Sequence, residues 1–174
     1  MRDKIIQLFC ESKEEKSDSF CYMLYLKPKQ EKAFIKMQKD LGLKGELTES
    51  GKFHITVRYV KTLRSPEMLV GWLQAQDLPS PKGKTKSFGI YGKENDALVV
   101  EVDGKEIHEW FKKVNKFLTD NDFPESDYDT YKPHITLTYE EGIEKPEWKE
   151  EYEFDLEFGI HVVTDTDYKE VWRK

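Results

Sequence analysis

The chain has 174 residues, of which 37% are hydrophobic and 13% aromatic, so it is too rich in core-forming residues for a disordered chain. This length suits one domain spanning residues 1–174. The net charge of -6 argues against tight binding to long nucleic acid, which normally requires a basic surface, but a local pocket can still bind a small anion.

The N-terminal residues and the cysteines indicate the cellular compartment of the protein. Residues 1–16 contain no apolar run long enough for a signal peptide, and no stretch of the chain approaches the length of a membrane span. We therefore expect a cytoplasmic protein, in the host cytoplasm if the chain is viral, with no membrane partner. Cys10 and Cys21 have no metal-binding spacing, and we expect both to be reduced.

Apolar spacing in the first half of the chain predicts helices and strands in alternation. In chain order these are a helix, a strand, a helix, a strand and a helix, over residues 3–16, Phe20–Leu26, Gln30–Leu41, Phe53–Val60 and Glu67–Gln76. Within the second strand, alternation places Phe53, Ile55, Val57 and Tyr59 on one face and His54, Thr56 and Arg58 on the other.

The second half opens with a predicted loop over Leu78–Lys86. Its three lysines, Lys82, Lys84 and Lys86, predict either a solvated loop or a flap over an anionic ligand. The elements that follow are two strands joined by a turn, a helix with a clear apolar stripe and two further strands, over Ser87–Tyr91, Ala97–Val102, Glu106–Leu118, Pro133–Tyr139 and Tyr152–Val163. The repeated order of strand, helix and strand indicates an α+β fold of two similar halves.

Two nearly identical tetrapeptides carry the strongest functional signal. They are His54-Ile55-Thr56-Val57 and His134-Ile135-Thr136-Leu137, each within a predicted strand. Residues i and i+2 of a strand point the same way, so each motif offers an imidazole and a hydroxyl on one face. If the two strands lie side by side, four polar groups converge. A single strand histidine is more often structural, but two matching copies favour a shared site.

These four side chains suit the cleavage of a phosphodiester without a metal or another cofactor. A neutral histidine can take the proton of an attacking hydroxyl or water, and a protonated histidine can supply one to the leaving oxygen. The hydroxyls can donate to the non-bridging phosphate oxygens. We therefore predict His54, Thr56, His134 and Thr136 as catalytic residues, and the sequence alone does not say which histidine is the acid.

The sequence resembles the two-histidine (2H) phosphoesterases, a superfamily marked by paired His-x-Thr/Ser motifs. Among its branches, it is most similar to the phage anti-CBASS nucleases, which destroy the cyclic oligonucleotide alarms of bacterial defence systems. The resemblance extends over most of the chain from Phe20 and is carried by Lys52–Val57, Ala97–Val102, Asp122–Pro124 and Tyr131–Tyr139. It implies a bilobal α+β fold, with two related β-sheet lobes, helices outside and a central cleft.

The resemblance also suggests residues that bind the substrate. Tyr22 matches a tyrosine on the first strand of that branch, and Tyr91 stands where an aromatic residue, expected as tryptophan, precedes the central hairpin. His161 stands where the branch carries an acidic residue. Arg58, from its predicted face, could meet a phosphate or pair with a surface carboxylate.

The resemblance implies a monomeric enzyme that hydrolyses 3′–5′ bonds of cyclic di- or trinucleotides, such as cGAMP, to evade CBASS defence. Its partner is then a small cyclic oligonucleotide. Two alternatives remain open. One is a 2H enzyme acting on RNA 2′,3′-cyclic phosphates or 2′,5′-oligoadenylate. The other is a sponge that captures cyclic nucleotides without cutting them, although a sponge has no need of two titrating groups.

Overall fold

The computed structural model describes residues 19–92, 94, 96–126 and 130–174. Its strands are β1 (Ser19–Leu26), β2 (Glu46–Leu47), β3 (His54–Lys61), β4 (Lys82–Tyr91), β5 (Ala97–Asp103), β6 (His134–Tyr139), β7 (Asp155–Thr164) and β8 (Glu170–Arg173). Its helices are α2 (Pro28–Asp40), α3 (Glu67–Gln74) and α4 (Lys105–Asp120), with a 3₁₀ turn at Glu150–Tyr152. The predicted helix over residues 3–16 and Cys10 lie outside the described residues, whereas Cys21 is buried.

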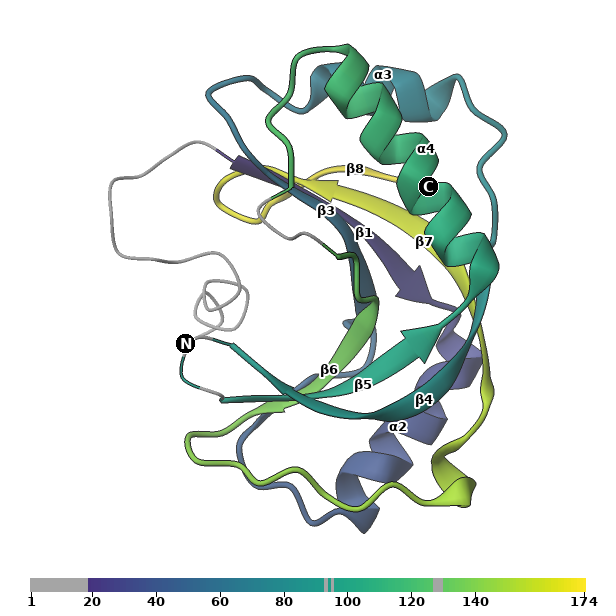
Figure 1. Cartoon of the computed structure of the whole chain (residues 1–174), viewed down its shortest axis with the longest axis vertical. Coiled ribbons are helices and arrows are strands. Elements are labelled where there is room, and N and C mark those ends of the chain that lie inside the picture. The colour runs from purple at the N-terminus through teal and green to yellow at the C-terminus, as the bar shows by residue number, and fades with distance from the viewer. Residues whose placement is uncertain (1–18, 93, 95, 127–129) are drawn as a thin grey trace.

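The described strands form one antiparallel sheet in the order β2-β6-β5-β4-β7-β1-β3, with β8 paired to β7. Strand β7 belongs to both halves, because Asp155–Glu157 pairs with β4 and the residues from Phe158 onward pair with β1. The sheet curls so that its two ends face each other across a concave side, while the helices lie on the outer side (Figure 1). The predicted α+β architecture of two related sheet halves with helices outside is confirmed.

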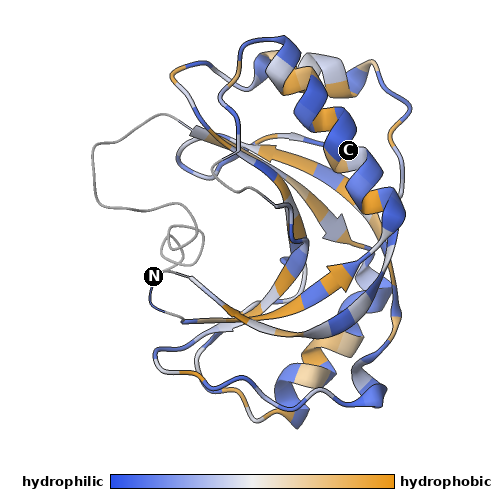
Figure 2. Ribbon diagram, viewed as in Figure 1, coloured by the Kyte–Doolittle hydropathy of each residue, from blue (hydrophilic) through white to orange (hydrophobic). Residues whose placement is uncertain are grey.

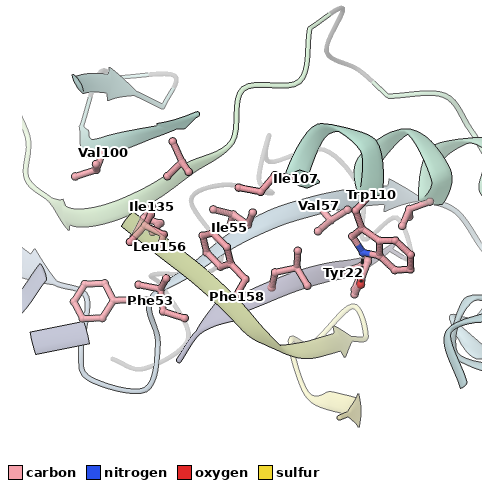
Figure 3. Close-up of a cluster of buried hydrophobic side chains, with 14 of the residues drawn as sticks. Tyr22, Phe53, Ile55, Val57, Val100, Ile107, Trp110, Ile135, Leu156 and Phe158 are labelled. Carbon is pink, nitrogen blue, oxygen red and sulfur yellow. Dashed lines mark hydrogen bonds between the residues drawn. The ribbon is translucent and has the colours of Figure 1, made fainter. Parts of the chain in front are cut away.

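The main core lies between the outer face of the sheet and the helices. Strand β1 is buried on both faces, as expected of a nearly unbroken apolar run in the middle of a sheet. Its residues Tyr22 and Leu24 join the main core, and Trp110 of α4 packs there as well (Figure 3). The next residue along β1, Met23, belongs to a smaller cluster on the concave side.

Helix α4 shows how the sequence pattern produces this core. Its apolar residues recur at helical spacing between hydrophilic ones (Figure 2), and the buried set is Ile107, Trp110, Val114 and Leu118. The predicted helix over Glu106–Leu118 therefore differs from the observed one only at its ends. No helix in the described part of the chain is both long and apolar enough to cross a lipid bilayer.

The predicted loop over Leu78–Lys86 is wrong in its second part, because β4 already begins at Lys82. In the sheet, Lys82 lies opposite Glu157 and Lys84 opposite Asp155, so lysines face carboxylates across the strands. Lys84 also forms an ion pair with Glu153 at 2.5 Å. The basic segment is thus a paired strand rather than a free flap. The short strands β2 and β8 are additions that the sequence pattern did not predict.

Candidate active site

The two His-x-Thr motifs have the same local structure. Strand β3 pairs with β1, and β6 pairs with β5, each with one register shift. In β3 the pairing passes from Thr56 directly to Arg58, which leaves Val57 as an extra residue. In β6 it passes from Thr136 to Thr138, which leaves Leu137 as the extra residue. Both motifs therefore carry a β-bulge at their fourth position.

The bulge changes which residues share the face of the histidine. Residues paired across two strands point to the same side, so Tyr59 lies on the concave side with its partner Cys21, whereas Arg58 lies on the core side with Tyr22. Arg58 is buried and donates from Nη2 to the carbonyl oxygen of Pro124 at 2.6 Å. The prediction that Arg58 shares the face of His54 and Thr56 is wrong, because regular alternation ends at the bulge.

Each histidine is fixed by its own backbone. The Nδ1 atom of His54 lies 2.7 Å from the carbonyl oxygen of Lys52, and that of His134 lies 2.8 Å from the carbonyl oxygen of Lys132. A carbonyl oxygen only accepts, so Nδ1 carries the proton. In the neutral rings Nε2 is then the basic nitrogen. In an imidazolium ring, Nε2 can release its proton without breaking the backbone hydrogen bond.

The curl of the sheet brings the two motifs together. Strands β3 and β6 are not hydrogen-bonded neighbours in the sheet order. Their Cα atoms nevertheless approach within 8 Å, across the concave side. The hydroxyl of Tyr131 connects them, since it donates to the carbonyl oxygen of Thr56 at 3.1 Å just before β6 begins. His54, Thr56, His134 and Thr136 are all half-buried.

Tyr91 is the one predicted substrate-binding residue that lies beside a motif histidine. Its ring meets that of His134 edge to face at 4.7 Å between centroids. Its hydroxyl donates to Glu101 at 2.7 Å. On the other side of the site, Tyr25 stacks on His54 at 5.0 Å. Each histidine thus has a tyrosine ring against it, from β4 in one case and from β1 in the other.

Tyr22 and His161 meet each other, but in the main core. Both are fully or nearly fully buried, and the hydroxyl of Tyr22 lies 2.6 Å from Nδ1 of His161. Trp110 donates from Nε1 to that hydroxyl at 2.8 Å, so the hydroxyl proton goes to His161. Nε2 of His161 then donates to the carbonyl oxygen of Pro79 at 2.8 Å. The prediction that these residues bind substrate conflicts with this location, on the opposite face of the sheet.

Two lysines bring positive charge to the site of an otherwise acidic protein. Lys52 and Lys132 each stand two residues before a motif histidine. Burial lowers the pKa of His54 to about 4, against the hydrogen bond to the Lys52 carbonyl, and positive charge on His134 and Lys52 lowers it further. Burial also lowers the pKa of His134, while the Lys132 carbonyl and the Glu101 carboxylate oppose that shift. Among the described residues, no three His, Cys, Asp or Glu side chains group as metal ligands do.

The low pKa of His54 predicts a pH-dependent cost to stability. Between its ordinary pKa of 6.5 and its folded pKa of about 4, His54 binds a proton in the unfolded chain but not in the folded one. The free energy of unfolding therefore falls as the pH drops through this window. The His54→Asn variant lacks this contribution, so we expect its stability relative to the wild type to improve from about pH 7.5 to about pH 5. Urea unfolding at both pH values measures this, and parallel pH dependence of the two proteins would contradict it.

Comparison with known proteins agrees with this geometry. A family model described as "Anti-CBASS protein Acb1" matches residues 22–172. The chain belongs to the Acb1 family. This assignment confirms the predicted resemblance to 2H phosphoesterases and to their anti-CBASS branch. The chain is therefore a phosphodiesterase with an anti-CBASS role. Comparison with curated protein sequences gives no significant match.

Solved structures share the fold of this Acb1 family member. The protein TT0787 of Thermus thermophilus superposes with a TM-score of 0.64 and 13% identity, covering 89% of this chain and 96% of the other. Escherichia coli LigT complexed with 3′-AMP superposes with a TM-score of 0.60 and 11% identity, covering 90% of this chain and 97% of the other. A structure described as a phosphoesterase gives a TM-score of 0.61 and 11% identity, covering 91% and 97%. At these identities the likeness establishes the fold.

Three residues near the site of this Acb1 chain, Lys52, Lys132 and Glu101, were not predicted from the sequence. The lysines could have been found, because the repeat extends to Lys-x-His-x-Thr in both copies, from Lys52 and from Lys132. No repeat or motif in the sequence predicts that Glu101 lies near the site. It lies in the apolar strand β5, and only the pairing of β5 with β6 places it opposite His134.

Proposed function

We propose that this enzyme hydrolyses the 3′–5′ phosphodiester bonds of cyclic di- or trinucleotide messengers, such as cGAMP, in the cytoplasm of a bacterial host infected by a phage. Its membership of the Acb1 family supports the class of target. The acidic chain, at a net charge of -6, suits a small ligand better than long RNA. We further propose that it acts as a monomer.

The observation that carries this proposal is the matched pair of histidines. Both Nδ1 atoms are bound to backbone carbonyls, at 2.7 Å for His54 and 2.8 Å for His134, and the two strands meet across the concave side. One Nε2 atom takes the proton of the attacking hydroxyl, from water or from a ribose 2′-OH, as its oxygen bonds to phosphorus. The other Nε2–H protonates the leaving ribose oxygen as the old P–O bond breaks. The ring protons are then exchanged with water.

The hydroxyls and lysines complete the proposed site. Thr56 and Thr136 follow the histidines at i+2, so their hydroxyls are placed to donate to the non-bridging oxygens of a phosphate held between the rings. Lys52 and Lys132 supply positive charge for the bound anion. Structures of the fold relative LigT have been solved with 3′-AMP, with ATP and with NADP+, which agrees with a nucleotide ligand for this fold.

Chromatography of reaction products tests the substrate. The purified protein is incubated with cyclic di- and trinucleotides, 2′,5′-oligoadenylate and a 2′,3′-cyclic phosphate, each in large molar excess over the enzyme. Linear products from the cyclic oligonucleotides support the proposal. Cleavage of only the last two substrates would move the enzyme to the processing of RNA ends. Stoichiometric capture without turnover would make the protein a sponge.

Activity is expected to survive removal of metal ions. The proposed proton transfers and phosphate contacts come from histidine, threonine and lysine side chains, so a chelator such as EDTA should leave kcat within about twofold. Initial rates before and after dialysis against the chelator measure this. Loss of activity that a divalent cation restores would contradict the proposed chemistry.

A further inference from the structure

The two halves of the site differ in the residue that faces each histidine. In one half, a row of paired residues runs across three adjacent strands from Ile160 through Tyr25 to His54. In the other half, the equivalent row runs from Ser87 through Glu101 to His134. Residues directly opposite in an antiparallel pair have Cβ atoms about 5 Å apart. The residue paired with His134 is therefore Glu101, whose carboxylate acts on the charge of His134, whereas the residue paired with His54 is Tyr25.

The carboxylate of Glu101 is held in its charged form by two hydroxyl donors. Ser87 donates from Oγ to one oxygen at 2.6 Å, and Tyr91 donates to the other at 2.7 Å. Burial raises the pKa of Glu101, but these two hydrogen bonds and the charges of Lys132 and Lys86 outweigh it and leave the pKa lowered. Because both oxygens are bound, the side chain has one fixed orientation.

Gly89 makes this arrangement possible. A Cβ atom at Gly89 would lie 2.8 Å from the ring of Tyr91 and 3.4 Å from a carboxylate oxygen of Glu101. The ring of Tyr91 can therefore lie back over β4, with its hydroxyl on Glu101 and its ring on His134, only where no side chain stands at position 89. The tyrosine that was predicted to touch substrate thus also supports the carboxylate.

The half around His54 offers no carboxylate in the corresponding position. The ring of Tyr25 stacks on His54, and burial raises the pKa of Tyr25 to about 12, so its hydroxyl stays neutral. The guanidinium of Arg173 lies over the same ring, 5.3 Å from its centroid, and is bound to Glu170. Positive charge on His134 and Lys52, rather than a carboxylate, acts on His54 and opposes its protonation.

We propose that Glu101 is a positioning residue that makes His134 hold its proton more tightly than His54 does, so that His134 is the general acid and His54 the general base. This inference rests on the proposed function. Among the residues that the structure describes, the charged and titratable groups placed toward His134 are Glu101 from β5, Tyr91 from β4, His54 from β3 and its own neighbour Lys132. Glu101 is the negative charge in this set. In the reaction, Nε2 of His54 takes the proton of the attacking hydroxyl, and Nε2–H of His134 protonates the leaving oxygen.

Replacing Glu101 by glutamine tests the inference, because the change removes the charge and keeps the shape. NMR titration of the ring signals in the wild type should show His134 binding its proton at higher pH than His54. In Glu101→Gln the pKa of His134 should fall by about 1, and that of His54 should stay in place. The alkaline limb of kcat/KM belongs to the acid, so activity on that limb should fall about tenfold.

The control is Asp103→Asn, which removes a charge from an exposed position on the same strand, and it should leave both histidines unchanged. A pKa of His134 that does not respond to Glu101→Gln, or that falls equally in the control, would overturn the inference. So would a wild-type titration in which His54 holds its proton to higher pH, and this measurement needs no variant to fold. Absence of cyclic nucleotide cleavage, with the titration as expected, would instead reject the proposed function and leave the electrostatic assignment standing.

Discussion

Replacing either motif histidine by alanine is expected to lower kcat by about 10²–10⁴-fold while the protein stays folded. His54→Ala removes the proposed proton acceptor, and His134→Ala removes the proposed donor. Neither ring belongs to the main core, so the loss should appear in the chemical step rather than in stability. The change in KM should be smaller, since Thr56 and Thr136 remain to hold the phosphate.

His108, a histidine outside both motifs and outside the buried Tyr22 network, provides the matched control. It lies on α4, where its ring packs edge to face against Tyr131, and it takes no part in the proposed chemistry. Single-turnover rates and circular dichroism of the three alanine variants separate catalysis from folding. The double variant at positions 54 and 134 should be hardly slower than the worse single variant, because the two groups act in one step. A single variant of either motif that keeps full activity would reject the assignment of that histidine.

The strand positions of the two His-x-Thr motifs and the fold class could be predicted from the sequence because both depend on local pattern. The alternation of polar and apolar residues in His54–Val57 and His134–Leu137 predicts strands with the histidines on one face, and the register confirms this face for both. The apolar stripe from Ile107 to Leu118 similarly predicts α4. The resemblance of the two motifs to 2H phosphoesterases then supplied the arrangement of the halves.

The substrate-binding predictions depended on information that the local pattern does not contain. Regular alternation assigned Arg58 to the face of His54, but the extra residue Val57 turns Arg58 into the core. No residue type in this stretch predicts a β-bulge. The second copy of the repeat shows the same burial, because Thr138, which corresponds to Arg58, is buried as well.

The prediction that Tyr22 and His161 bind substrate conflicts with their core position for a different reason. Strand β1 is apolar at nearly every position, so its sequence does not tell which face meets the helices and which lines the concave side. The pairing of Leu24 with His161 fixes this, and it turns His161 toward the core. A buried histidine and a buried tyrosine then satisfy each other, a contact that joins residues 139 positions apart.

The buried network around Tyr22 leads to the second large effect: Tyr22→Phe should lower the free energy of unfolding by about 2–4 kcal/mol. The lost hydroxyl leaves the indole N–H of Trp110 and Nδ1 of His161 without their partner, and each unsatisfied buried group costs about 1–3 kcal/mol. Urea unfolding near neutral pH measures the loss. Turnover well below the unfolding transition should stay within about twofold of the wild type, since the network lies on the opposite face of the sheet from His54 and His134.

Tyr152→Phe makes the same chemical change at another tyrosine of the main core, one outside this network, and should cost less than about 1 kcal/mol. The difference between the two variants isolates the network from the general effect of removing a core hydroxyl. Equal losses in both would mean that the bonds to Trp110 and His161 contribute nothing beyond burial. If Tyr22→Phe instead kept the stability of the wild type and raised KM, Tyr22 would belong with the substrate, and the core position of its hydroxyl would have to change when the substrate binds.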